Sequence, residues 1–134
     1  MNAQTKENLV TALHGEAFAY LKYLSFAKQA REEGRVELAD LYEKIANGER
    51  MEHFAEEAAL LGLVGTASAN LEAAISGESY ETVTMYPEFA AQAAAAGDQA
   101  AADLFAEIGN DEKAHLAEFK AALQALHTAP AVAR

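Results

Sequence analysis

Residues 15–34 read GEAFAYLKYLSFAKQAREEG, and residues 77–97 read GESYETVTMYPEFAAQAAAAG. Residues 38–52, LADLYEKIANGERME, correspond in the same way to residues 101–115, AADLFAEIGNDEKAH. In each segment apolar residues recur at three- and four-residue steps, which places them on one face of a helix. The chain is therefore expected to be a duplicated helical hairpin, and its fold class to be all-α with four helices.

Apolar stripes and helix-ending residues give the expected bounds of these helices. Gly34 and Gly97 follow the first and third stripes, and glycine commonly ends a helix. We expect one domain over residues 1–134, with four helices at about 5–33, 36–62, 70–96 and 98–127.

The alignment of the two halves shifts inside the third predicted helix. Gly15 aligns with Gly77, which is an offset of 62 residues. Tyr23 aligns with Tyr86, which is an offset of 63 residues. One additional residue therefore lies in the second half, just before Pro87. Insertions within helices are often absorbed as π-bulges, which are frequent at functional sites. We expect a π-bulge at this position.

Composition and charge narrow the possible chemistry. The 134 residues contain no cysteine, so disulfides and iron–sulfur clusters are excluded within them, and a metal would need oxygen and imidazole ligands. The net charge of −11 argues against nucleic acid, because a phosphate backbone needs a basic surface. No segment reaches the roughly 20 apolar residues of a membrane span, so we expect a cytoplasmic protein without membrane contact.

Each predicted helix interrupts its apolar face with carboxylates. Glu16 and Glu78 are equivalent in the two halves, and so are Glu49 and Glu112. Buried carboxylates without a cationic partner are costly, and several together also repel one another. No stripe of lysine or arginine faces these positions, so a bound metal is the expected counter-charge. His115, three residues after Glu112, completes an E-x-x-H spacing that suits one metal ion.

Further side chains near the equivalent glutamates extend this set. Glu81 lies three residues after Glu78 and is an expected ligand, although Ala19 stands at the corresponding place in the first half. Tyr23 and Tyr86 occupy equivalent places two turns after the first glutamate of each half. Such aromatic residues usually pack in a core, but each phenol could also donate a hydrogen bond to a ligand carboxylate.

The second predicted helix leaves one ligand ambiguous. Glu49 is followed by Glu52 after three residues and by His53 after four, and either side chain could turn toward the same metal. The internal repeat aligns Glu52, and not His53, with His115. We therefore expect Glu52 to be the ligand, with His53 as the alternative.

The ligand set points to a particular class of metal. Oxygen-rich ligands with imidazole suit iron or manganese, and glutamates from two helices with Glu-x-x-His from two others are typical of di-iron carboxylate bundles. The charge of two ferric ions would be balanced by six carboxylates, namely Glu16, Glu49, Glu52, Glu78, Glu81 and Glu112. We expect two iron ions, with manganese or a mixed pair as the alternative.

The sequence resembles the rubrerythrin family, specifically its ferritin-like di-iron domain. The resemblance covers nearly the whole chain, through the GEA and GESYE segments, the MYPEFA stretch and the DEKAH motif. It implies a ferritin-like four-helix bundle and a non-haem di-iron peroxidase that reduces hydrogen peroxide to water in oxidative-stress defence. The ligands that it implies are Glu16, Glu49, Glu78, Glu81, Glu112 and His115.

Two departures from the family pattern affect the expected chemistry. Rubrerythrins usually carry a rubredoxin domain with iron on four cysteines, so here electrons would come from a separate donor such as a rubredoxin-like or flavin protein. The family's second-helix motif is E-x-x-H, where this sequence has Glu52. In the family, that histidine and the carboxylate matching Glu81 exchange at one iron. Glu81 and Glu52 are therefore the predicted catalytic residues, and the preference for peroxide or dioxygen is left open.

Two other functions fit parts of the same pattern. A ferroxidase or small iron-handling protein would use the same ligands with dioxygen in place of peroxide. A metal-free helical interaction module would turn its acidic stripes outward, toward a basic partner.

The length of the central link predicts how the chain assembles. From Glu49 to Gly62 the second helix would extend about 20 Å beyond the metals, and from Asn70 to Glu78 the third would begin about 12 Å before them. If these helices run parallel, as in the ferritin-like arrangement, the link must cover roughly 32 Å plus a lateral step of about 9 Å. Residues 63–69 reach at most about 25 Å. We therefore expect a domain-swapped homodimer, in which each site combines hairpins from two chains.

Overall fold

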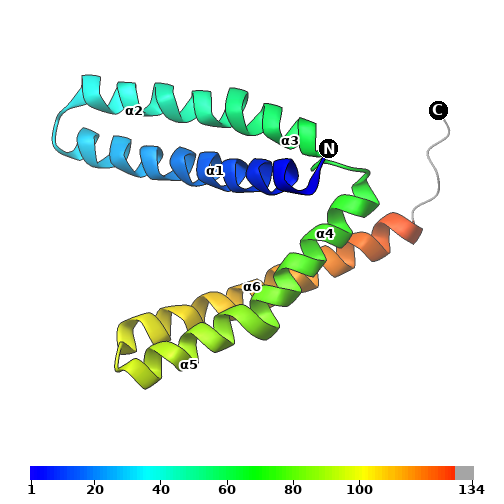
Figure 1. The fold of residues 1–134 in the computed structure, drawn as a ribbon. Coiled ribbons are helices and arrows are strands. Elements are labelled where there is room, and N and C mark those ends of the chain that lie inside the picture. The colour runs from blue at the N-terminus through cyan, green and yellow to red at the C-terminus, as the bar shows by residue number, and fades with distance from the viewer. Residues whose placement is uncertain (129–134) are drawn as a thin grey trace. The chain divides into compact units, whose positions relative to one another are not determined.

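The structure, a computed structural model, describes residues 1–128 of the chain. Within this range the regular secondary structure is helical, and the chain divides between Val64 and Gly65 into two compact units. Each unit is a helical hairpin (Figure 1). The predicted all-α class and the two duplicated hairpins are confirmed, and residues 129–134 of the predicted domain lie outside the described range. No helix in residues 1–128 combines the length and apolar character needed to cross a membrane.

The first hairpin begins with one long helix, α1 (Ala3–Glu32). Its second arm consists of three consecutive segments, namely α2 (Val36–Gly48), the π-helical η1 (Glu49–Phe54) and α3 (Ala55–Leu61). Asn2 caps α1, because its side chain accepts a 2.8 Å hydrogen bond from the amide of Thr5. Both α2 and α3 pack against α1, so the second arm lies along the first (Figure 1).

The second hairpin has its interruption in the first arm. That arm consists of α4 (Ala67–Tyr80), the π-helical η2 (Glu81–Met85) and α5 (Tyr86–Ala96). The second arm is the single helix α6 (Gln99–Thr128). The Thr66 hydroxyl caps α4 by accepting a 3.2 Å hydrogen bond from the amide of Ala69. The largest difference between predicted and observed helix bounds lies at the start of this arm, because the third helix is predicted to begin at residue 70 and α4 begins at Ala67.

A glycine stands at the turn between the arms of each hairpin. Gly34 has a φ of +73° and Gly97 a φ of +84°, which glycine adopts without the steric cost of a Cβ atom. In both turns the amide of the next residue donates to the carbonyl oxygen five residues earlier, at 2.8 and 2.9 Å. These contacts explain why helical structure stops at both predicted positions.

Small residues let the two arms of each hairpin approach closely. Ala27, Ala30 and Ala39 form a buried cluster between α1 and α2. In the second hairpin, a Cβ atom added at Gly109 of α6 would lie 3.0 Å from the Cβ atom of Tyr86. Side-chain size at these positions therefore sets the spacing between the arms.

The duplication extends to the aromatic packing. Equivalent trios of rings lie in the two hairpins, namely Tyr23, Phe26 and Tyr42 in the first, and Tyr86, Phe89 and Phe105 in the second. The centroids of the second and third rings are 5.6 Å apart in both trios, and those of the first and third are 6.3 Å apart in both. The two halves thus share a packing arrangement as well as a sequence pattern.

Each hairpin contains one π segment, but in opposite arms. The π-bulge predicted just before Pro87 is confirmed by η2, which ends at Met85. The second π segment, η1, is not predicted by the sequence analysis. Because π-helical hydrogen bonds run to the fifth residue, such a segment holds one more residue per turn and changes which side chains share a face.

Candidate metal centre

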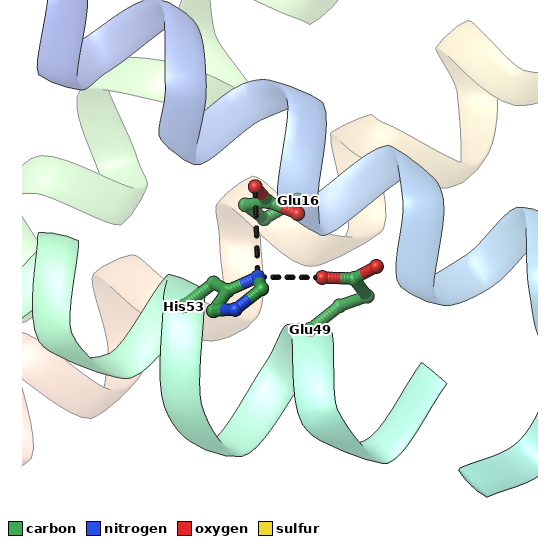
Figure 2. Close-up of side chains that lie close together, drawn as sticks. All are labelled: Glu16, Glu49 and His53. Carbon is green, nitrogen blue, oxygen red and sulfur yellow. Dashed lines mark hydrogen bonds and ion pairs between the residues drawn. The ribbon is translucent and has the colours of Figure 1, made fainter. Parts of the chain in front are cut away.

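In the first hairpin, a carboxylate–histidine cluster joins the two arms (Figure 2). Glu16 comes from α1, and Glu49 and His53 come from η1. The Nδ1 atom of His53 lies 2.8 Å from Oε2 of Glu49 and 3.8 Å from Oε1 of Glu16. Two carboxylates and one imidazole nitrogen therefore converge on one point, and we name these three residues the first half-site.

The second hairpin contains an equivalent cluster. Glu78 comes from α4, and Glu112 and His115 come from α6. The Nδ1 atom of His115 lies 2.6 Å from Oε2 of Glu112 and 3.9 Å from Oε2 of Glu78. In each cluster, one potential ligand atom per residue lies within 4.8 Å of the others. We name this cluster the second half-site.

The carboxylates of both half-sites are partly withdrawn from solvent. The side chains of Glu49 and Glu112 are each 15% exposed, whereas the two imidazoles are more than half exposed. Partial burial raises the pKa of Glu16 and of Glu78, and the adjacent carboxyl of Glu49 or Glu112 raises it further. Both half-sites therefore gather carboxylates at positions that are partly shielded from solvent.

The half-site carboxylates also change the pKa values of the two histidines. The hydrogen bond to Glu49 is the largest cause that raises the pKa of His53, and the bond to Glu112 does the same for His115. The bond to His115 in turn lowers the pKa of Glu112. A positive charge is thus favoured at the centre of each half-site, whether it is a proton or a metal ion.

The donor atoms of the half-sites fit iron. Oxygen and imidazole donors suit iron or manganese, and no thiolate is available in this sequence. The Oε2 atom of Glu78 is buried and has no hydrogen-bond partner among residues 1–128. A buried carboxylate oxygen without a partner is costly, and coordination to a cation would satisfy it.

The structure brings His53, rather than Glu52, to the first half-site. Glu52 is exposed and does not belong to the cluster. The reason is η1, because in a π-helical segment a four-residue step nearly completes one turn and superposes His53 on Glu49. The geometry favours the alternative that the sequence analysis left open, and a ligand role for Glu52 stays a prediction.

The internal repeat contains a signal that identifies His53. After η1 the sequence HFAEE matches HLAEF of the second half, with His53 opposite His115 and Glu56 opposite Glu118. The offset between the halves is larger by one at Glu49 than at Gly15, and at His53 it returns to its earlier value. A second additional residue, this time in the first half, therefore lies between Glu49 and His53, and η1 absorbs it.

The remaining predicted residues lie near the second half-site or in the aromatic packing. Glu81 begins η2 and is half-buried, and its charge contributes to the raised pKa of Glu78. Burial is the main cause that raises the pKa of Tyr86, followed by the charges of Glu81 and Glu112. Tyr23 stacks on another tyrosine of the first hairpin. Within residues 1–128 neither phenol donates a hydrogen bond to a half-site carboxylate, so their supporting role stays a prediction.

Known proteins resemble the chain across both hairpins. The family model described as Rubrerythrin matches residues 7–61 and 49–123. The chain is 36% identical to nigerythrin of Nitratidesulfovibrio vulgaris over 88% of this chain and 65% of nigerythrin. It is 34% identical to rubrerythrin of the same organism over 87% of this chain and 68% of rubrerythrin. The chain thus spans about two thirds of the length of these curated relatives.

Solved structures give a further match. That of nigerythrin in its fully reduced, all-ferrous state aligns with 95% of this chain and 69% of that chain, at 32% identity and a TM-score of 0.48. The family assignment depends on the sequence matches, which include both half-sites. The chain belongs to the rubrerythrin family, as its sequence predicts.

Proposed function

We propose that this chain is a non-haem di-iron oxidoreductase that reduces hydrogen peroxide to water. The observation that supports the proposal most is the equivalence of the two half-sites. Each supplies two carboxylates and one imidazole within 4.8 Å, from corresponding places in the two hairpins. A pair of metal ions needs two such sets, and family membership favours iron as their occupant.

The half-site residues would hold the metals and balance their charge. Glu16, Glu49 and His53 would bind in the first half-site, and Glu78, Glu112 and His115 in the second. Glu81, whose charge acts on Glu78, would be an additional ligand of the second. The same oxygen and nitrogen donors would also accept manganese or a mixed pair.

A ferrous pair would supply the two electrons that are consumed when one hydrogen peroxide and two protons become two water molecules. The chain's own residues would position these ions, and the negative charges of the four partly buried half-site carboxylates would stabilise the positive charges of the metals. The phenol of Tyr86 lies near enough to feel the charges of Glu81 and Glu112, so it could donate a hydrogen bond to a ligand carboxylate. Because these 134 residues lack cysteine, a rubredoxin-like or flavin protein would return the electrons.

The proposed complete site combines hairpins from two chains. From Glu49 to Leu61 the second arm runs about 18 Å, and from Ala67 to Glu78 the third runs about 17 Å. In a parallel arrangement, the connection would have to cover roughly 35 Å to place both half-sites at one depth. Residues 62–66, which join α3 to α4, reach at most about 22 Å. This shortfall supports a domain-swapped homodimer.

Rapid mixing tests the proposed reaction. Protein loaded anaerobically with Fe²⁺ is mixed with hydrogen peroxide or with air-saturated buffer, and iron oxidation is followed by absorbance. Faster oxidation by peroxide is expected. Faster oxidation by dioxygen would favour a ferroxidase, and failure to bind iron would contradict both functions. Glu112→Gln should impair loading, whereas Glu107→Gln, an exposed change on the same helix, should not.

Light scattering on the iron-loaded protein tests the proposed assembly. The expected result is a dimer whose iron content requires both half-sites. A monomer that holds two iron ions would contradict domain swapping but not the proposed reaction.

A further inference from the structure

Glu57 is a carboxylate for which the helical fold gives no partner. It lies in α3, one turn after His53, and its side chain is half-buried. Its Oε2 atom is buried and has no hydrogen-bond partner among residues 1–128. None of the ion pairs found in that range includes it. Leaving a carboxylate oxygen in this state is costly unless a cation satisfies it.

Glu57 lies on the face of the second arm that carries the first half-site. Glu49, His53 and Glu57 follow one another at four-residue steps, which place side chains on one face. The pKa of Glu16 provides a second indication. Burial is the largest cause that raises it, and the charge of Glu57 is one of the smaller causes. Glu57 is therefore close enough to Glu16 to act on it electrostatically.

The realigned repeat shows that Glu57 is specific to the first hairpin. With His53 opposite His115, the residue opposite Glu57 is Phe119. The second hairpin has its own additional carboxylate, Glu81, whose counterpart is Ala19. Apart from Glu43, which pairs with Arg31, each hairpin thus contains one half-buried carboxylate beyond the shared ligands, at a different place in its fold.

Building on the proposed di-iron function, we propose that Glu57 supplies a third carboxylate to the metal bound by the first half-site. Glu57 would add the same negative charge to the first half-site that Glu81 adds to the second. Glu57 lies in the second arm of its hairpin, whereas Glu81 lies in the first arm of its own. The six carboxylates that balance two ferric ions would then be Glu16, Glu49, Glu57, Glu78, Glu81 and Glu112. Exposed Glu52 is not needed for this balance.

Two glutamine substitutions at neighbouring positions test the role of Glu57. Glu57→Gln removes the charge of the half-buried side chain and keeps its size, whereas Glu56→Gln removes an exposed charge beside it. Two quantities are measured for each variant, the thermal midpoint of the metal-free protein and the affinity for Fe²⁺ by anaerobic chelator competition. Glutamine keeps one side-chain oxygen that could still bind a metal. Glu57→Ala removes this oxygen as well, and its Fe²⁺ affinity is therefore measured too.

Glu57→Gln is expected to change the thermal midpoint and the Fe²⁺ affinity in opposite directions. The midpoint of the metal-free protein should rise, because the charge of a half-buried, unpaired carboxylate is removed, while Fe²⁺ affinity should fall by roughly ten-fold or more. In Mössbauer spectra of the ferrous protein, only one of two iron components should change. Glu56→Gln should change none of these quantities.

Two outcomes would overturn the inference, and they are distinguishable. If the unaltered protein and Glu56→Gln bind two iron ions and both Glu57 variants bind them as tightly, only the role of Glu57 is refuted. If none of the proteins binds iron, the proposed function fails together with it.

Discussion

The two hairpins reach the same ligand geometry by different local structures. In the second hairpin, Glu112 and His115 stand three residues apart on an uninterrupted α-helix. In the first, Glu49 and His53 stand four residues apart on a π segment. Both histidines nevertheless place Nδ1 at hydrogen-bond distance from a glutamate oxygen of their own arm, at 2.8 and 2.6 Å. An additional residue can therefore be inserted between two ligands without separating them.

Metal removal should have the largest effect, and it acts on both hairpins. A ligand present at about a thousand times its dissociation constant stabilises a protein by roughly 4 kcal/mol. Removing iron with a chelator should therefore lower the thermal midpoint by many degrees, as followed by circular dichroism at 222 nm. Addition of Fe²⁺ should restore it. An unchanged midpoint would mean that the half-sites do not hold metal.

Substitution of either histidine should have the next largest effect, which is on Fe²⁺ binding. His53→Ala and His115→Ala should each weaken Fe²⁺ binding by roughly ten- to hundred-fold, because each removes the only imidazole of its half-site. Glu52→Ala, the matched control on η1, should leave binding unchanged, since Glu52 lies outside the first half-site. Isothermal titration under nitrogen measures all three. A strong effect of Glu52→Ala with none of His53→Ala would restore the ligand that the sequence analysis preferred.

These positions show how far the sequence could be interpreted. The helices, their glycine turns and the Glu16/Glu78 equivalence follow from the apolar period and the duplication, and all three appear in the structure. The insertion before Pro87 is visible because long matching segments flank it. The ligand after Glu49 is harder to assign, because residues three and four places after Glu49 both lie on its face of an α-helix. The internal repeat then favours Glu52, since the additional residue that η1 absorbs between Glu49 and His53 is not flanked by long matching segments.

A smaller effect tests the packing difference between the hairpins. Gly109 in α6 corresponds to Ala46 in α2, which is fully buried. Gly109→Ala should destabilise the protein by about 1 kcal/mol, because its Cβ atom would lie 3.0 Å from that of Tyr86 and overpacking outweighs the better helix propensity. Ala46→Gly should cost a similar amount, about 1 kcal/mol, through lost propensity. Urea unfolding of the metal-free protein measures both, and a stabilised Gly109→Ala would show that the arms can separate.

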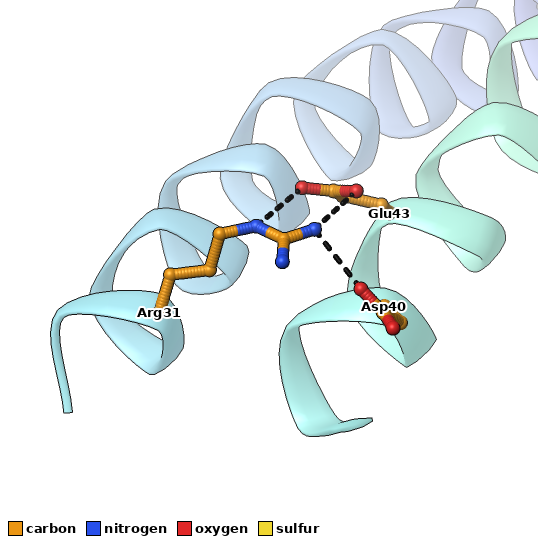
Figure 3. A network of polar contacts seen from close by, with 3 residues as sticks. All are labelled: Arg31, Asp40 and Glu43. Carbon is orange, nitrogen blue, oxygen red and sulfur yellow. Dashed lines mark hydrogen bonds and ion pairs between the residues drawn. The ribbon is translucent and has the colours of Figure 1, made fainter. Parts of the chain in front are cut away.

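The smallest expected effect concerns a network that only the first hairpin has. Arg31 donates to Glu43 at 2.8 and 3.1 Å and to Asp40 at 3.0 Å (Figure 3). In the second hairpin, alanine replaces both Arg31 and Glu43, at positions 94 and 106. Exposed ion pairs contribute little and are screened by salt, so Arg31→Ala should lower the midpoint slightly at low salt and not at high salt. A large loss that salt does not reduce would mean that the arginine stem stabilises the turn by packing.

Anomalous diffraction at the iron absorption edge tests the central claim most directly, on crystals of protein loaded anaerobically with Fe²⁺. The account predicts two iron peaks, one bound by Glu16, Glu49 and His53 and the other by Glu78, Glu112 and His115. A map without iron at these residues, or with a peak on the Glu52 side of η1 instead, would contradict it.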